Sequence, residues 1–136
     1  MIDHIGLNVG DIARATEFYL KALAPLGYGI VMRVSAEETG HGAAVGFGAQ
    51  GPAEDFQSGK PSFWIGEGDG ASGPMHVAFV APSRAAVDAF YAAALKAGGS
   101  DNGAPGVRPH YHANYYGAFV FDPDGNNAEA VCHMAK

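Results

Sequence analysis

The sequence predicts an α+β fold in which two tandem βαβββ modules form one curved, mixed and mostly antiparallel sheet around a cleft. Three observations lead to this prediction. Strand-like and helical hydrophobic patterns alternate, and their order occurs twice, with His4 and His76 at equivalent places 76 − 4 = 72 residues apart. The 20 Gly and 8 Pro among 136 residues are spread along the chain, which is typical of many short elements joined by turns. We expect a single domain over residues 1–136, with modules at about 1–70 and 73–136.

The first half begins with a strand that alternates apolar and polar residues from His4 to Val9. Asp11 is the expected N-cap of a helix with apolar side chains at helical spacing, and Pro25 with Gly27 ends it. Three further strands are expected over Tyr28–Val34, Ala43–Gly48 and Ser62–Glu67.

The second half repeats this order. His76–Val80 is the first strand, Ser83 is the equivalent of Asp11 at the start of a helix, and Gly98-Gly99 ends that helix. The turn sequence Asp122-Pro123-Asp124-Gly125 lies between two apolar runs and predicts a hairpin, because the turn requires a positive φ that Gly adopts freely. Its two strands are expected at Gly117–Phe121 and Asn127–His133, and the remaining strand falls between Gly98 and Tyr116, where the pattern is less regular.

Charge and composition exclude several classes of function. The net charge is −6, whereas nucleic acids and anionic membranes require a basic surface, so neither is an expected partner. No stretch approaches the roughly 20 apolar residues of a membrane span, and the N-terminus lacks the pattern of a signal peptide. The single Cys132 fits a reducing compartment. These features predict a cytoplasmic protein, in which a metal site would be built from imidazole and carboxylate groups.

Three residues form a candidate metal site. His4 and His76 begin equivalent strands, each with small residues on its own face, and Glu129 is an acid among apolar residues in the last strand. A buried carboxylate requires a cation, a hydrogen-bond donor or water. Two imidazoles and one carboxylate would leave coordination positions open for a substrate, as in catalytic zinc and non-haem iron sites. The alternative is that each histidine is a hydrogen-bonded structural residue.

The run from Arg108 to Tyr116 combines three tyrosines, two histidines and an arginine within nine residues. Tyr116 and His112 are candidate catalytic residues, since a phenol can donate to an oxyanion and a histidine can transfer protons near neutral pH. Arg108 could pair with a carboxylate or phosphate on a substrate. The same run could equally form a packed lid or a dimer surface.

The tandem modules resemble the vicinal oxygen chelate superfamily, which includes glyoxalase I, extradiol dioxygenases, fosfomycin-resistance transferases and bleomycin-resistance proteins. The resemblance extends from His4 to His133. Its best local matches are Asp3–Val9, Met75–Phe79 and Phe121–Val131. It implies that His4, His76 and Glu129 occupy the metal-ligand positions of the family, and that the protein is a homodimer.

The sequence departs from the glyoxalase I pattern at one metal-ligand position, and this departure narrows the range of expected activities. Glyoxalase I-type lyases take a fourth ligand from the strand of the first module equivalent to that of Glu129. Aligning residues 61–65 with 126–130 places Trp64 there, and an indole does not ligate a divalent metal. The three-ligand pattern looks more like a dioxygenase, a fosfomycin-type transferase or a relative of other chemistry.

Two functional hypotheses remain open. The first is a glyoxalase/dioxygenase-type enzyme that uses a divalent metal (Zn, Fe, Mn or Ni) to chelate vicinal oxygens of a small substrate. The second is a metal-free protein that binds a small molecule or drug in the same cleft, as bleomycin-resistance proteins do. Trp64, Arg108 and Tyr115 are the candidate substrate-binding residues in either case. A degenerate member that serves as an interaction module is a third, weaker hypothesis.

Overall fold

The computed structural model describes residues 2–51, 59–68 and 74–136. Its elements follow the predicted order, strand, helix and three strands, twice over. They are β1 (Ile5–Val9), α1 (Ile12–Leu23), η1 (Ala24–Leu26), β2 (Tyr28–Val34), α2 (Ala36–Thr39), β3 (Ala44–Ala49), β4 (Phe63–Glu67), β5 (His76–Val80), α3 (Arg84–Lys96), β6 (Ser100–Val107), β7 (Tyr116–Phe121) and β8 (Asn127–Cys132). The short helix α2 is an addition to the predicted elements, and β6 supplies the strand whose bounds the sequence pattern left open.

The described strands form two four-stranded sheets, in the orders β1-β4-β3-β2 and β5-β8-β7-β6. In each sheet the first and last strands of the module pair in parallel, and the other pairs are antiparallel. The prediction of two mixed βαβββ modules is therefore confirmed. The described strands are divided between the two sheets, and the modules meet through side chains: Phe79 of β5 packs against Phe63 of β4, with ring centroids 5.0 Å apart.

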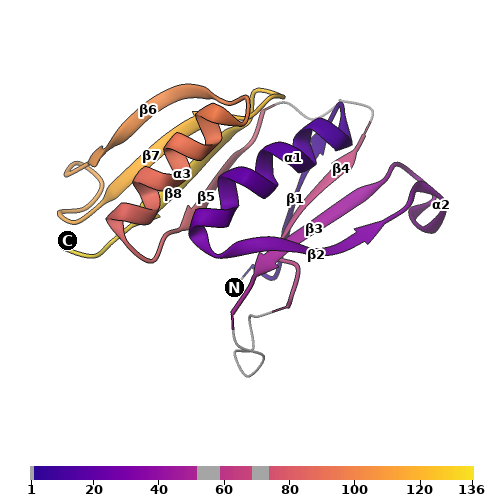
Figure 1. The fold of residues 1–136 in the computed structure, drawn as a ribbon, viewed down its shortest axis with the longest axis horizontal. Coiled ribbons are helices and arrows are strands. Elements are labelled where there is room, and N and C mark those ends of the chain that lie inside the picture. Colours follow the sequence, from indigo (N-terminus) through magenta and orange to yellow (C-terminus); the bar gives the residue numbers. More distant parts are fainter. Residues whose placement is uncertain (1, 52–58, 69–73) are drawn as a thin grey trace.

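Both long helices begin where the repeat predicts. The Asp11 side chain accepts a hydrogen bond from the Arg14 N–H, and the Ser83 hydroxyl accepts one from the Ala86 N–H, so each residue is an N-cap. α1 and α3 lie next to each other on the near face of the molecule in Figure 1. Between these helices and the sheets lies an aromatic core. Its largest members include Phe18, Tyr19, Phe47, Phe63 and Phe90.

The opposite face of each sheet is open along its first strand. His76, Ala78 and Val80 alternate with the partly or fully buried residues of β5, and all three are exposed. His4 and Gly6 are likewise exposed at the start of the first module. The alternation of side chains along a strand places the predicted ligand histidines on these open faces, away from the helices.

The turn between β7 and β8 connects the two modules. Asp122 is 4% exposed, and its carboxylate accepts hydrogen bonds from the Tyr19 hydroxyl on α1 (2.6 Å) and from the backbone N–H groups of Asp124 and Asn126. Gly125 has a φ of 87°, as the predicted turn requires. The turn sequence thus has a structural role, since it fixes the second sheet to the helix of the first module.

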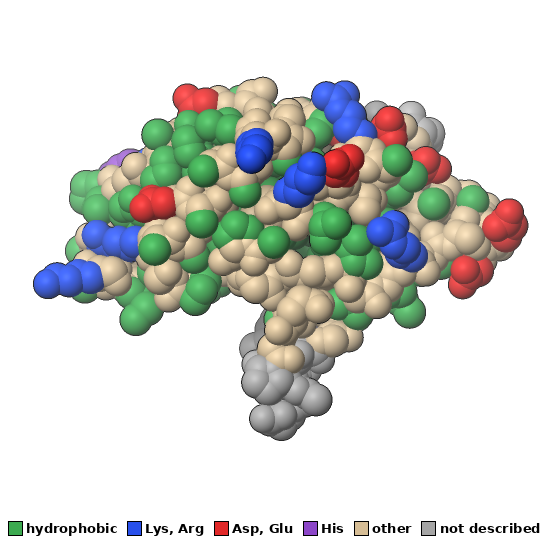
Figure 2. Space-filling model, in the orientation of Figure 1, with side chains coloured by type: hydrophobic (Ala, Val, Ile, Leu, Met, Phe, Trp, Pro, Cys, Tyr) green, Lys and Arg blue, Asp and Glu red, His purple; other side chains and the backbone are tan. Residues whose placement is uncertain are grey.

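The helix face carries scattered charges rather than one basic patch. Figure 2 shows Lys and Arg side chains separated by apolar groups and by Asp and Glu on this face. No helix within the described residues is long and apolar enough to cross a membrane.

Candidate functional site

Glu129 is the centre of the candidate site. This residue of β8 is 1% exposed, and both of its carboxylate oxygens have a partner. The Nε2 atom of His76 lies 2.8 Å from Oε2, and the Tyr115 hydroxyl donates a hydrogen bond to Oε1. A buried carboxylate without such partners would be strongly unfavourable, so these contacts explain how the acid is accommodated. Partial burial of the phenol and its hydrogen bond to Glu129 raise the pKa of Tyr115.

The register of the second sheet brings these groups together. Ala78 of β5 lies opposite Glu129, so His76, two residues earlier, is on the same face. On the other side of β8, Phe119 of β7 lies opposite Glu129. Gly117 leaves the space for the tyrosine, because a Cβ atom there would lie 3.1 Å from the Tyr115 ring and 3.4 Å from Glu129 Oε1.

A small cavity opens onto this cluster. Its volume is about 280 Å³. It is lined by His76, Tyr111, Tyr115, Phe119 and Glu129. The arrangement combines a few converging polar atoms with aromatic walls, as in many small-molecule sites. Tyr111 and Phe119 were not among the predicted site residues. The alternation of β7 could have indicated Phe119, whereas Tyr111 belongs to the aromatic run from Arg108 to Tyr116 that the sequence did indicate.

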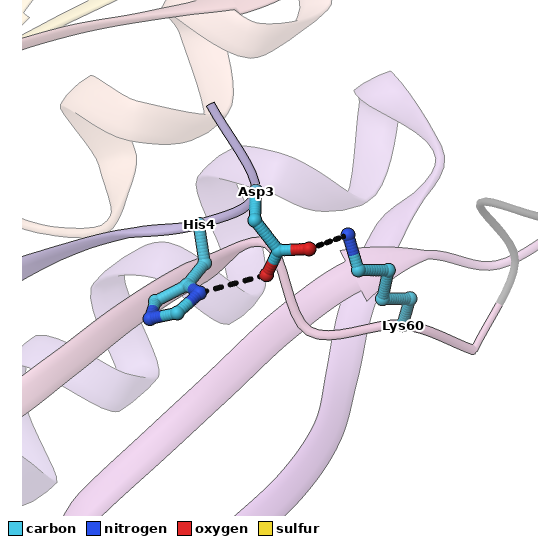
Figure 3. Close-up of polar contacts among 3 residues, drawn as sticks. All are labelled: Asp3, His4 and Lys60. Carbon is cyan, nitrogen blue, oxygen red and sulfur yellow. Dashed lines mark hydrogen bonds and ion pairs between the residues drawn. The ribbon is translucent and has the colours of Figure 1, made fainter. Parts of the chain in front are cut away.

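The third predicted ligand is held elsewhere in the chain. His4 precedes β1 in the other sheet, with 59% of its side chain exposed. Its Nδ1 atom lies 2.8 Å from Asp3 Oδ1, and the other Asp3 oxygen lies 2.5 Å from Lys60 Nζ (Figure 3). Among residues 2–51, 59–68 and 74–136, no three His, Cys, Asp or Glu side chains are grouped so that they could hold a metal ion. The structure therefore brings His76 and Glu129 together but does not add His4 of the same chain.

Comparison with known proteins identifies the family. The sequence model of the Glyoxalase/Bleomycin resistance protein/Dioxygenase superfamily matches residues 1–130. The chain belongs to this superfamily. Its members include metal-dependent enzymes and resistance proteins. No curated protein sequence matches the chain.

Solved structures of the glyoxalase superfamily have the same fold. A glyoxalase/bleomycin resistance protein from Albidiferax ferrireducens T118 is 25% identical, with a TM-score of 0.72 and coverage of 97% of this chain and 98% of that one. A family enzyme from Burkholderia phytofirmans PsJN is 16% identical, with a TM-score of 0.67 and the same coverage. A mutant of the fosfomycin resistance protein FosX from Listeria monocytogenes, complexed with Mn(II) and 1S,2S-dihydroxypropylphosphonic acid, is 17% identical (TM-score 0.64, covering 96% and 88%).

His76 and Glu129 fit two adjacent ligands of a divalent ion. In octahedral coordination, ligand atoms about 2.1 Å from one ion and at a right angle to each other lie about 3.0 Å apart. The observed separation of Nε2 and Oε2 is 2.8 Å, so a small outward movement of either side chain would admit an ion between them. Imidazole and carboxylate donors suit Zn, Fe, Mn and Ni alike, which leaves the identity of the metal open, as expected from the sequence.

Trp64 occupies the position equivalent to Glu129. Gly6 of β1 pairs with Trp64, just as Ala78 of β5 pairs with Glu129, and Gly6 and Ala78 are equivalent in the repeat. Trp64 is half-buried, and its ring lies over Gly46, where a Cβ atom would come within 3.0 Å of the indole. The first module of this glyoxalase-superfamily chain thus has an indole where the second has its carboxylate.

The other predicted site residues do not line the cavity of Glu129. Tyr116 faces α3, where its hydroxyl donates to Asp88 Oδ1 at 2.7 Å. Arg108 donates to the carbonyl oxygens of Gly106 and Ala104, both at 2.8 Å, and its guanidinium lies 5.4 Å from the centre of the Phe119 ring. Arg108 therefore packs against a wall residue of the cavity.

His112, the second predicted catalytic residue, is exposed. Its Nδ1 atom accepts a hydrogen bond from the Asn114 N–H at 3.1 Å, and its ring lies 5.9 Å from that of His133. His112 therefore closes a turn of the segment that carries Tyr111 and Tyr115.

Proposed function

We propose that the protein is a metal-dependent enzyme of the glyoxalase/dioxygenase type, with a divalent cation held by His76 and Glu129 and a small substrate bound in the adjoining cavity. The observation that carries this proposal is the buried Glu129 carboxylate beside an imidazole at a cavity on an open sheet face. Two donors are too few for a stable site, so we propose His4 of a second copy as the third ligand. The functional unit is then a homodimer.

The chain's own residues have distinct roles in this proposal. Glu129 and His76 supply the donor atoms, and the Tyr115 hydroxyl orients the carboxylate through Oε1. Tyr111 and Phe119 form aromatic walls that limit the access of water to the bound substrate. A divalent cation at this position supplies a Lewis acid for adjacent substrate oxygens. Trp64 would contribute a stacking surface from the first module.

A second function has one observation in its favour. His76 and Tyr115 already satisfy both oxygens of Glu129 without a cation. A metal-free protein that binds a small molecule between the aromatic walls is consistent with this network. Metal content distinguishes the two functions.

The test is elemental analysis of protein purified without chelator and without a nickel-affinity tag. We expect close to one divalent ion per chain in the wild type and loss of the ion in His76→Ala and Glu129→Ala. His41→Ala is the matched control, since His41 is an exposed histidine between α2 and β3. The His41→Ala protein should retain the metal. Glu129→Gln provides a second variant that keeps the size of the side chain if Glu129→Ala does not fold. Wild-type protein that is metal-free and does not bind added Zn²⁺, Mn²⁺, Fe²⁺ or Ni²⁺ would support the metal-free function instead.

A further inference from the structure

The Asp3 carboxylate is held between two positively polarised groups. One oxygen contacts the Nδ1 atom of His4 and the other contacts the ammonium group of Lys60 (Figure 3). An aspartate side chain next to a cation is ionised at neutral pH, and an ionised carboxylate only accepts hydrogen bonds.

The parallel pairing of β1 and β4 explains why these residues meet. The Ile5 N–H donates to the carbonyl oxygen of Ser62 at 3.0 Å, so the two strands begin at the same edge of the sheet. Asp3 lies two residues before β1 and Lys60 three residues before β4. A cation at this point thus fixes the acid next to the histidine.

The repeat does not require this arrangement. The residue equivalent to Asp3 in the second module is Met75, which has no charge. The two histidines also use different ring nitrogens: His4 contacts its carboxylate through Nδ1, whereas His76 contacts Glu129 through Nε2. Asp3 is therefore a feature specific to His4.

We propose that Asp3, held in place by Lys60, is a positioning residue that fixes His4 as the tautomer protonated at Nδ1. A neutral imidazole carries one N–H, and an ionised carboxylate can only accept, so the proton must be on Nδ1 and the lone pair on Nε2 is free. Nε2 is then ready to bind a cation, as with metal-binding histidines whose other nitrogen donates to a carboxylate. The significance of this tautomer for metal binding rests on the function proposed above, whereas the tautomer itself does not.

The first test is nitrogen NMR of the histidine side chains in the metal-free protein, at a pH above the range in which histidine titrates. In the wild type, Nε2 of His4 should show the shift of an unprotonated ring nitrogen. Asp3→Ala should move His4 toward the Nε2–H form that free histidine prefers, and Lys60→Met should give an intermediate mixture. The inference is wrong if His4 carries its proton on Nε2 in the wild type, or if Asp3→Ala leaves the tautomer unchanged.

Glu17→Ala is the matched control. Glu17 is an exposed carboxylate paired with Lys21 Nζ at 2.7 Å, so its removal changes the net charge as Asp3→Ala does without touching a histidine. The His4 signals should stay as in the wild type. Asp3, His4 and Lys60 are all substantially exposed, and exposed ion pairs contribute little to stability, so the Asp3 and Lys60 variants should remain folded.

The second test is a zinc titration of the same proteins. Asp3→Ala should weaken zinc binding by about tenfold, the lower end of the range for loss of such a carboxylate, and Glu17→Ala should not. Equal affinity in wild type and Asp3→Ala would contradict the positioning role. If the wild type binds no zinc, the titration is repeated with Mn²⁺, Fe²⁺ and Ni²⁺. Binding of none of the four ions would contradict the proposed metal function, while the NMR result would still decide whether Asp3 sets the tautomer.

Discussion

The Glu129 side chain can remain buried because two neighbouring side chains each contact one oxygen of its carboxylate. Alternation along the chain determines which tyrosine takes part. Tyr116 begins β7 and faces α3, so Tyr115, one residue earlier, turns toward the open face and reaches Glu129. A run of two tyrosines therefore contributes one residue to the cavity and one to the helix interface.

The Tyr115 hydroxyl should matter for stability. Tyr115→Phe leaves one oxygen of a buried carboxylate without its donor, and we expect the free energy of unfolding to fall by about 1–2 kcal/mol. Urea denaturation followed by circular dichroism measures this change. Tyr111→Phe is the control, because Tyr111 is 62% exposed and its hydroxyl has no hydrogen bond to the described residues. This control should change stability by less than about 0.5 kcal/mol. Equal losses in both variants would contradict the role assigned to Tyr115.

At the scale of elements, the sequence predicted those strands and helices whose patterns are regular. Asp11 and Ser83 cap their helices as expected, and Gly125 forms the predicted turn. The bounds of β6 were left open by the sequence, and its pairing with β7 is irregular: the register shifts around Gly103, which has a φ of 146°. α2 was missed although Ser35 and Glu38 form a capping box, a signal that the sequence does contain.

The turn between β7 and β8 provides a test of how the elements are joined. The Tyr19 hydroxyl donates to buried Asp122, so Tyr19→Phe removes a hydrogen bond to a charged group and should lower the free energy of unfolding by about 2 kcal/mol. Burial and the neighbouring Asp122 carboxylate raise the pKa of Tyr19, which accordingly keeps its proton. Tyr91→Phe is the matched control, since Tyr91 makes a similar bond to exposed Asp101, and it should cost less than about 1 kcal/mol. Thermal or urea unfolding compares the two. A larger loss in Tyr91→Phe would show that the turn does not anchor the second sheet.

For the whole molecule, the repeat predicted which positions are equivalent but not which of them share a cavity. The equivalence of Trp64 and Glu129 is confirmed by strand register. The separation of His4 from His76 could not be predicted, because it depends on how the modules pack, and Phe79 against Phe63 fixes that packing. The open face of the second sheet also exposes the side chain of Val80 by 73%.

A mixed-dimer experiment tests whether two copies complete the metal site. A protein that carries only His4→Ala, or only Glu129→Ala, should not bind the metal. If His4 of one chain joins His76 and Glu129 of the other, a dimer of the two variants contains one intact and one doubly altered site. Random pairing on co-expression makes about half of the dimers mixed, so about one quarter of the wild-type metal content should return. Elemental analysis of the co-expressed protein measures this recovery. The mixed dimer can also be isolated with two different affinity tags, neither containing histidine. It should hold about half of the wild-type metal content. A site formed within one chain predicts no recovery, because each chain then lacks one of its own ligands.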